Sequence, residues 1–169
     1  TSIYLLNEND EFEILGLTLD DAAGEVLDKI ARFLNLGYPG GPAIEKISIN
    51  GNPDSYKLPR PMLDKGFNFS FSGLKTAVIY MVRKDKSLLS EEKLPDLAAS
   101  FQKAVIDVLV KKTIRVAISY EVPIIALAGG VSSNSYLRSE MKERAYNHQL
   151  YLLYIYKKPG NLLNLLLVK

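Results

Sequence analysis

The sequence predicts an α/β fold, because short apolar strands and longer amphipathic helices succeed one another along the chain. Two strands over Ser2–Leu6 and Phe12–Leu15 flank a polar turn and indicate a hairpin. A strand over Ile124–Ala128, introduced by Pro123, contains only small and apolar residues, which is typical of a strand buried on both faces. Because several helices separate the hairpin from this strand, an α+β arrangement is the alternative.

Length and composition indicate one globular domain. The chain has 169 residues, enough to bury a sizeable core, and 47% of them are hydrophobic and 24% charged. A net charge of +2 gives no argument for nucleic acid or a membrane as a partner. The sequence has no cysteine for a disulfide or a thiolate metal site, and no apolar run reaches the ~20 residues of a membrane span. Because the sequence opens at Thr1 within an apolar run, we expect a piece of a longer protein.

The first long helix is predicted over Leu19–Leu36, with Thr18 as its N-cap and Gly37 after its end. Its buried stripe consists of apolar residues at helical spacing: Leu19, Ala22, Ala23, Val26, Ile30, Phe33 and Leu34. Asp28 lies on another face, one turn after Gly24. A glycine there leaves room for a ligand beside a carboxylate; the alternative is a tight helix–helix contact with Asp28 in solvent.

A second helix is predicted after the turn at residues 37–42. Pro42 suits the first helical position, Gly41 the cap and Gly51 the end, which places Glu45 one turn inside the helix. The N–H of Gly41 could hydrogen-bond a ligand hydroxyl, or the glycine could serve only to meet a backbone angle.

The middle of the chain begins with a proline-rich segment, residues 52–65, which is expected to be irregular and to cross the surface. Three phenylalanines alternate with polar residues over 67–71, as in a strand, and a helix is predicted from Leu74 to about Arg83. The run Ser72–Thr76 resembles a phosphate loop but lacks its glycine spacing. We therefore interpret it as a capped turn into the helix, with the role of Lys75 open.

A charged linker over residues 84–93 leads into a long helix, predicted from Pro95 to about Tyr120. The helix carries a basic cluster of Lys111, Lys112 and Arg115. Such a cluster is expected to form a solvated face; contact with tRNA or a partner is the alternative.

The strand at Ile124–Ala128 runs into Gly129 and Gly130 and then into a helix through Arg144, for which one of residues 132–134 is the cap. Glycine lets a phosphate group approach the backbone N–H groups at the positive end of a helix. This turn is a candidate seat for a nucleotide or another phosphate anion. The alternative is a turn that only closes a βα unit.

Six motifs in order resemble the TsaD family of tRNA threonylcarbamoyladenosine transferases, once described as sialoglycoprotein endopeptidases. They read TLDDAAGE at 18–25, DK at 28–29, GYPGGPAIE at 37–45, FSFSGLKT at 69–76, AASFQ at 98–102 and AGGVSSN at 128–134. The resemblance runs from Thr1 to about Tyr146.

The resemblance implies an actin-like ATPase (ASKHA) fold, whose two lobes close on a nucleotide-like ligand. Residues 1–146 are expected to form mainly the second lobe, with an inserted helical segment, and residues 147–169 a divergent apolar tail. The family transfers a threonylcarbamoyl group from its adenylate to the exocyclic amine of the adenosine beside the tRNA anticodon. The chain is therefore expected to be a fragment of a cytoplasmic acyltransferase.

The resemblance also assigns nucleotide-binding roles to six residues: Asp28, Gly41, Glu45, Gly129, Gly130 and Asn134. Asp28 matches the family's ligand-binding aspartate, whose carboxylate could accept hydrogen bonds from ribose hydroxyls. Gly41 and Glu45 match positions that hold the ribose or the base. Asn134 matches an asparagine that contacts the adenylate, and the two glycines before it allow close backbone approach. Catalytic residues are not assigned.

The family binds one Fe or Zn ion in addition to an adenylate or ATP ligand. Its metal site uses two histidines and an aspartate on segments that have no match in this sequence. His148 matches neither histidine position and is expected to be an ordinary surface residue. No metal ligand is therefore assigned, and the chain alone is expected to be inactive.

The partners implied by the resemblance are threonylcarbamoyl-adenylate, tRNA and the companion proteins of the modification complex, without a membrane. Self-association through the apolar tail is a further expectation. Two other functions compete: an ASKHA phosphotransferase of the sugar or acetate kinase kind, and a non-catalytic partner-binding fragment. A protease is not supported, because the sequence has neither a nucleophile–histidine pairing nor a His-Glu-x-x-His helix.

Overall fold

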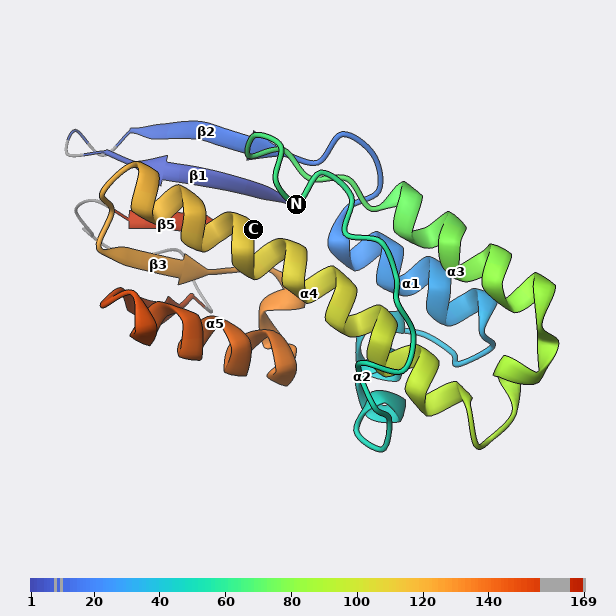
Figure 1. The fold of residues 1–169 in the computed structure, drawn as a ribbon. Helices are drawn as coiled ribbons and strands as arrows, with labels where there is room; N and C mark the ends of the chain where they lie inside the picture. Colours follow the sequence, from blue (N-terminus) through green and yellow to red (C-terminus); the bar gives the residue numbers. More distant parts are fainter. Residues whose placement is uncertain (8, 10, 156–164, 169) are drawn as a thin grey trace. The chain divides into compact units, whose positions relative to one another are not determined.

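The computed structural model describes residues 1–7, 9, 11–155 and 165–168. The chain divides into two compact units (Figure 1). The sheet unit comprises Thr1–Leu19, Met62–Phe69 and Leu109–Lys169, and the helical unit comprises Asp20–Pro61 and Ser70–Val108. The α/β class is confirmed.

In chain order the elements are β1 (Ser2–Leu6), β2 (Phe12–Leu17), α1 (Ala23–Phe33), α2 (Gly40–Ser48), α3 (Ser72–Lys84), the 3₁₀ helix η1 (Lys86–Leu89), α4 (Leu94–Ser119), β3 (Ile124–Leu127), the 3₁₀ helix η2 (Gly130–Ser133), α5 (Ser135–Asn147), β4 (Tyr151–Tyr154) and β5 (Leu165–Val168). Among the described residues, none of these helices combines the length and apolar character needed to cross a membrane.

The sheet unit is built on five strands in the order β2-β1-β5-β3-β4 (Figure 1). β1 is antiparallel to both β2 and β5, whereas β3 is parallel to both β5 and β4. The predicted hairpin is confirmed, and its second strand extends two residues beyond Leu15. The predicted buried strand is also confirmed, since Ile125, Ala126 and Leu127 are buried in β3.

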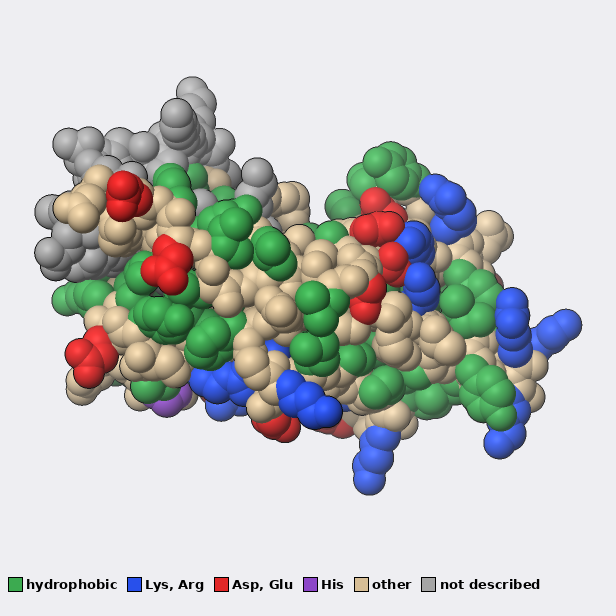
Figure 2. Space-filling model, turned by 90° about the horizontal axis from the view of Figure 1, so that it is seen from above, with side chains coloured by type: hydrophobic (Ala, Val, Ile, Leu, Met, Phe, Trp, Pro, Cys, Tyr) green, Lys and Arg blue, Asp and Glu red, His purple; other side chains and the backbone are tan. Residues whose placement is uncertain are grey.

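One face of the sheet is exposed at its outer strands β2 and β4, whereas Leu6 of β1 and Ala126 of β3 on that same face are buried. The strand register places on one face a set of apolar side chains that remain exposed: Phe12, Ile14, Tyr151 and Leu153. The opposite face carries buried side chains: Ile3, Ile125 and Leu127. Figure 2 shows hydrophobic side chains at several separate places on the surface that it draws. Self-association through the tail, which includes β4, stays a prediction.

In the helical unit, α1 packs against both α2 and α3. The inward stripe of α1 consists of small and branched apolar side chains: Ala23, Val26, Leu27, Ile30 and Ala31. Residues 52–60 contain no helix or strand, as expected. They lie along the first part of α4, where Asp96 accepts the N–H of Asn52 at 2.7 Å and Asp107 accepts two bonds from Arg60 at 2.7 and 3.0 Å.

The predicted start of the first helix is wrong by four residues. α1 begins at Ala23, and Thr18 forms a single β-bridge with Phe69 in place of a cap. Leu19 is 61% exposed and does not belong to the buried stripe. The physical reason is the pair Asp20 and Asp21, whose carboxylates accept hydrogen bonds from outside α1 and keep this segment in a turn.

The second helix also differs from its prediction. α2 begins at Gly40, two residues before Pro42, with Pro39 rather than Gly41 at the N-cap. A proline at the third helical position is tolerated, because the first N–H groups of a helix have no partner within it. The helix ends at Ser48, whose carbonyl accepts the N–H of Gly51 at 3.1 Å.

The strand predicted over residues 67–71 is wrong, since the only pairing there is the bridge at Phe69. The alternation of phenylalanine with polar residues has another cause, because Phe69 and Phe71 are both fully buried, each in a different unit. The helices predicted after this segment are confirmed as α3 and α4. The charged linker between them contains η1, which buries Leu88.

The basic cluster of α4 is a solvated face only at Lys111, which is exposed, because Lys112 is fully buried in the sheet unit and Arg115 is half-buried. Its Nζ donates to the carbonyl oxygens of Lys65 at 2.9 Å and Gly66 at 3.0 Å. Arg115 also donates to the oxygen of Gly66, and its guanidinium lies 5.6 Å from the centre of the Phe67 ring. These two cations bind the loop before α3 to α4.

Burial lowers the pKa of Lys112 to about 8, with a smaller contribution from the charge of Arg115. In the unfolded chain the ammonium keeps its ordinary pKa of 10.5. Between these values the unfolded chain binds a proton that the folded chain does not, so the free energy of unfolding rises with pH. Between these two pH values we expect the free energy of unfolding of the parent chain to rise by about 3 kcal/mol. Lys112→Met has no ammonium at this position and is expected to show no such rise.

Urea unfolding on either side of this pH window measures the effect. Lys111→Met is the matched control, because Lys111 is the exposed neighbour on the same helix. Parallel pH profiles for the parent chain and Lys112→Met would contradict the expectation.

Candidate functional site

The carboxylate of Asp28 lies where α1 and α2 approach each other most closely. Its Oδ1 accepts the N–H of Gly40 at 2.7 Å. A Cβ atom on Gly40 would lie only 2.4 Å from the Asp28 Cα and 2.8 Å from the carbonyl oxygen of Leu27. Glycine is therefore required at Gly40, whereas the sequence had indicated a close approach at Gly24.

Gly41 and Glu45 share α2 with Gly40. A Cβ atom on Gly41 would meet only Leu27 Cδ1, at 3.9 Å, so the space beside this glycine is open. Glu45 is half-buried one turn further along, as predicted. Of the six sequence-predicted residues, Asp28, Gly41 and Glu45 thus lie on two helices that pack together.

The other three predicted residues lie in the sheet unit, after β3. Gly129 has a φ of 86°, in the left-handed region that favours glycine, and Gly130 begins η2. Asn134 is buried and is the cap of α5, because its side chain accepts the N–H of Leu137 at 2.9 Å. The predicted cap is confirmed.

The N-terminus of α5 does not lie at the two glycines, which was the expectation for a phosphate seat. η2 separates them from α5, which begins at Ser135. Two serine hydroxyls close this turn: Ser132 donates to the oxygen of Gly129 at 2.7 Å and Ser133 to that of Gly130 at 2.6 Å. The carbonyl oxygens of Gly129 and Gly130 thus have partners within the turn.

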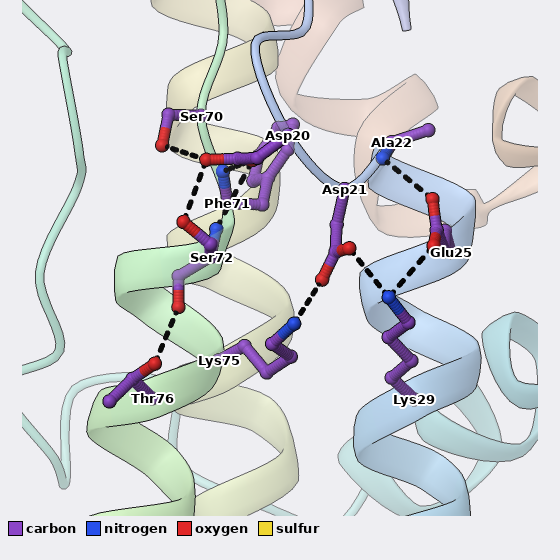
Figure 3. A network of polar contacts seen from close by, with 10 residues as sticks. All are labelled: Asp20, Asp21, Ala22, Glu25, Lys29, Ser70, Phe71, Ser72, Lys75 and Thr76. Atoms are coloured by element: carbon purple, nitrogen blue, oxygen red, sulfur yellow. Dashed lines mark hydrogen bonds and ion pairs between the residues drawn. The ribbon is translucent and has the colours of Figure 1, made fainter.

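A carboxylate that the sequence analysis did not single out lies at the start of α3 (Figure 3). Asp20 accepts four hydrogen bonds: from the Ser70 hydroxyl at 2.5 Å, the Phe71 N–H at 2.7 Å, and the Ser72 hydroxyl and N–H at 2.7 and 3.2 Å. A carboxylate is stabilised at this position, because the N–H groups at a helix start are unpaired and carry the positive end of its dipole.

Asp21, the next residue, joins α1 to α3 (Figure 3). Its two oxygens accept from Lys29 of α1 and Lys75 of α3, both at 2.6 Å. Lys29 also reaches Glu25 at 2.8 Å, and Glu25 in turn accepts the N–H of Ala22 at 3.3 Å. The network thus alternates in charge from one helix to the other.

Both aspartates have lowered pKa values, for different reasons. Partial burial raises the pKa of the Asp20 carboxyl, but the hydrogen bonds from Ser70, Phe71 and Ser72 together outweigh it, and the pKa lies below its ordinary value. The pKa of Asp21 is lowered first by the hydrogen bond from Lys29 and then by that from Lys75. Both groups are therefore ionised at neutral pH.

The likeness of Ser72–Thr76 to a phosphate loop has a structural explanation. The start of α3 does receive an anion, and that anion is the carboxylate of Asp20. Lys75, whose role the sequence left open, pairs with Asp21. Two adjacent aspartates are ordinary in the first turn of a predicted helix, so the sequence carried no local signal for these contacts.

The described residues offer no set of three or more histidine, cysteine, aspartate or glutamate side chains that could hold a metal ion. His148 is exposed at the end of α5, as expected for an ordinary surface residue.

Comparison with known proteins identifies close relatives. The sequence model of the TsaD family, described as tRNA N6-adenosine threonylcarbamoyltransferase, matches residues 1–156 and so reaches ten residues beyond Tyr146. A relative of the same description from Thermosipho africanus is 53% identical over 155 residues, which are 90% of this chain and 46% of the relative. One from Thermotoga neapolitana is 51% identical over 146 residues, with 86% and 43% covered. The chain spans less than half the length of these relatives.

The two adjacent glycines of α2 give a first prediction. We expect Gly40→Ala to lower the free energy of unfolding by about 2 kcal/mol or more, because its methyl group would overlap the backbone of Asp28. Gly41→Ala has room and is expected to leave stability unchanged or slightly higher, since alanine favours helix. Denaturant unfolding of the pair measures this, and equal losses would contradict the close approach at Gly40.

The Asp20 carboxylate gives a second prediction. Asp20→Ala is expected to lower the free energy of unfolding by about 1 kcal/mol, as for the loss of a helix cap. Asp54→Ala, which removes a carboxylate that is 77% exposed, serves as the control. The Asp20 contribution is present above the unfolded pKa near 3.8 and disappears as the pH falls through the lower folded pKa. A loss that stays constant into acid would show that the charge is not responsible.

Proposed function

Because this chain belongs to the TsaD family of tRNA N6-adenosine threonylcarbamoyltransferases, we propose that it forms part of such a transferase and carries residues that contact its nucleotide. The enzyme would transfer the threonylcarbamoyl group from its adenylate to the exocyclic amine of an adenosine in tRNA. In that step the amine nitrogen bonds to the carbamoyl carbon, the bond from that carbon to the phosphate oxygen breaks, AMP leaves, and the amine loses a proton.

The observation that carries the proposal is the position of the Asp28 carboxylate. It is held by the Gly40 N–H at 2.7 Å, beside a second glycine whose surroundings are open. A carboxylate has about four acceptor positions, and the backbone uses one of them. The remaining positions suit the paired hydroxyls of a ribose, and Gly41 would let the sugar or base approach the start of α2.

We assign the six residues the parts that their match to the family implies. Asp28 would accept bonds from the ribose, and Gly41 and Glu45 would adjoin the ribose or the base. Gly129, Gly130 and Asn134 would contact the adenylate. The side-chain oxygen of Asn134 also caps α5, where it accepts the N–H of Leu137.

The proposal extends to the fold and the domains. The sheet unit, with its strands and α5, fits the second lobe of an actin-like ATPase fold, and the helical unit fits an inserted segment. The family's sequence model ends at residue 156, so the divergent tail that we propose from residue 147 overlaps the last ten residues of that match. Together with tRNA, the adenylate and companion proteins, the enzyme would act in the cytoplasm.

The family's Fe or Zn ion finds no fitting donor set among the described residues. The proposed reaction therefore assigns no step to a metal ion. The residues of this chain would bind and orient the nucleoside. Since the chain spans less than half the length of its relatives, activity of the chain alone is not part of the proposal.

Calorimetric titration with AMP and with a non-hydrolysable threonylcarbamoyl-adenylate analogue tests the proposal. Asp28→Asn and Asn134→Asp are the informative variants, because the second keeps the oxygen that caps α5 while it removes the amide donor. We expect each to weaken binding about tenfold or more, as for the loss of a hydrogen bond to a charged group. Asp54→Asn is the control.

Two results would contradict the nucleotide site. One is a folded parent chain that binds neither ligand, which would favour the non-catalytic, partner-binding alternative. The other is unchanged affinity in both variants. An ASKHA phosphotransferase would instead prefer ATP to the threonylcarbamoyl-adenylate analogue.

A further inference from the structure

Tyr38 is an exposed aromatic side chain next to the candidate site. It is 81% exposed and lies in the turn that leads into α2. We propose that the ring of Tyr38 is a stacking surface for the adenine base of the ligand. This inference rests on the nucleotide site proposed above and adds to it a residue that recognises the base.

The distance along the chain supports this role. Tyr38 precedes Gly40 by two residues, which span at most about 7 Å between Cα atoms. The N–H of Gly40 in turn lies 2.7 Å from the Asp28 carboxylate. A tyrosine side chain is itself several ångströms long, so a ring at this position is close enough in the chain to reach a base whose ribose is held by Asp28.

The surroundings of Tyr38 leave the faces of the ring accessible. Gly37 before it has no atom within 4 Å of a Cβ position, and its φ of 97° suits glycine alone. Pro39 is exposed, and the two residues after it are glycines. The segment therefore presents one flat ring with no large neighbour along the chain.

The chemistry of the ring fits a base better than a phosphate or a sugar. Nucleobases stack on aromatic side chains through their faces, and the contact tolerates any base because each has a π-face. Stacking leaves the polar edge of the adenine available to Glu45 or to backbone groups. Asp28 would then hold the sugar and Tyr38 the base of the same nucleoside.

Other exposed tyrosines provide matched controls. Tyr80 is 67% exposed and lies on α3 of the same unit, but it has no glycine-rich helix start or ligand carboxylate beside it in sequence. A role of Tyr38 that depended only on surface exposure would be shared by Tyr80.

The chain contains no tryptophan, so Tyr38→Trp creates a single fluorescent reporter at this position. We expect saturable quenching of its emission by AMP or by an RNA anticodon stem-loop with an adenosine beside the anticodon, and none for Tyr80→Trp. Quenching by AMP alone identifies the base of the adenylate as the stacked group; quenching by RNA alone identifies the adenosine of the tRNA. Absent quenching, or equal quenching at both positions, would overturn the proposal.

Binding constants provide the second test. Tyr38→Ala is expected to weaken binding of the quenching ligand about tenfold, whereas Tyr38→Phe keeps the ring and should bind as the parent does. Ribose 5-phosphate, which has no base, should be insensitive to both changes and sensitive to Asp28→Asn.

These arms separate the two proposals. Binding that depends on Asp28 and is unchanged in Tyr38→Ala would overturn the role of Tyr38 and leave the nucleotide site intact. Absence of saturable binding of AMP and RNA by the folded parent chain would overturn both.

Discussion

The carboxylates of Asp20 and Asp21 determine how the helical unit is arranged. One receives the unpaired N–H groups at the start of α3, and the other joins lysines of α1 and α3. Since α1 begins directly after this pair, the turn sets both the direction of the helix and the place of Asp28 on it. α2 then approaches α1 closely at Gly40, whose N–H donates to the Asp28 carboxylate.

In the sheet unit the charged side chains that make such contacts are positive, whereas in the helical unit they are carboxylates. In the sheet unit, the buried ammonium of Lys112 and the guanidinium of Arg115 donate hydrogen bonds to backbone carbonyl oxygens of the loop before α3. In both units a side-chain charge on one element satisfies the backbone of a distant segment. Such contacts are specific, because a buried polar backbone group that loses its partner costs about 1–3 kcal/mol.

Local patterns in the sequence predicted most of the architecture. The hairpin, β3, α3, α4 and the cap at Asn134 depend on alternation, helical spacing or a cap a few residues away, and all were predictable. The start of α1 was not, because Thr18 is a good cap locally but pairs with Phe69, which lies 51 residues further along. The burial of Lys112 could not be predicted either, because its partners are backbone carbonyl oxygens 46 and 47 residues away. Since every residue has a carbonyl, no residue type in the sequence marks these partners. For the candidate site, sequence motifs predicted which residues belong to it. The role of Gly40 could not be predicted, because it depends on how α1 and α2 pack together.

The position of β5 affects how the protein can be synthesised and folded. β5 is the last of the described strands in the chain, yet it lies between β1 and β3. The hairpin of β1 and β2 can form as soon as it leaves the ribosome, because its contacts are local. Its inner edge then waits for β5 until the residues between β1 and β5 have also been translated. During that interval the inner edge of β1 lacks the strand that pairs with it in the folded unit, and an unpaired strand edge is prone to aggregation.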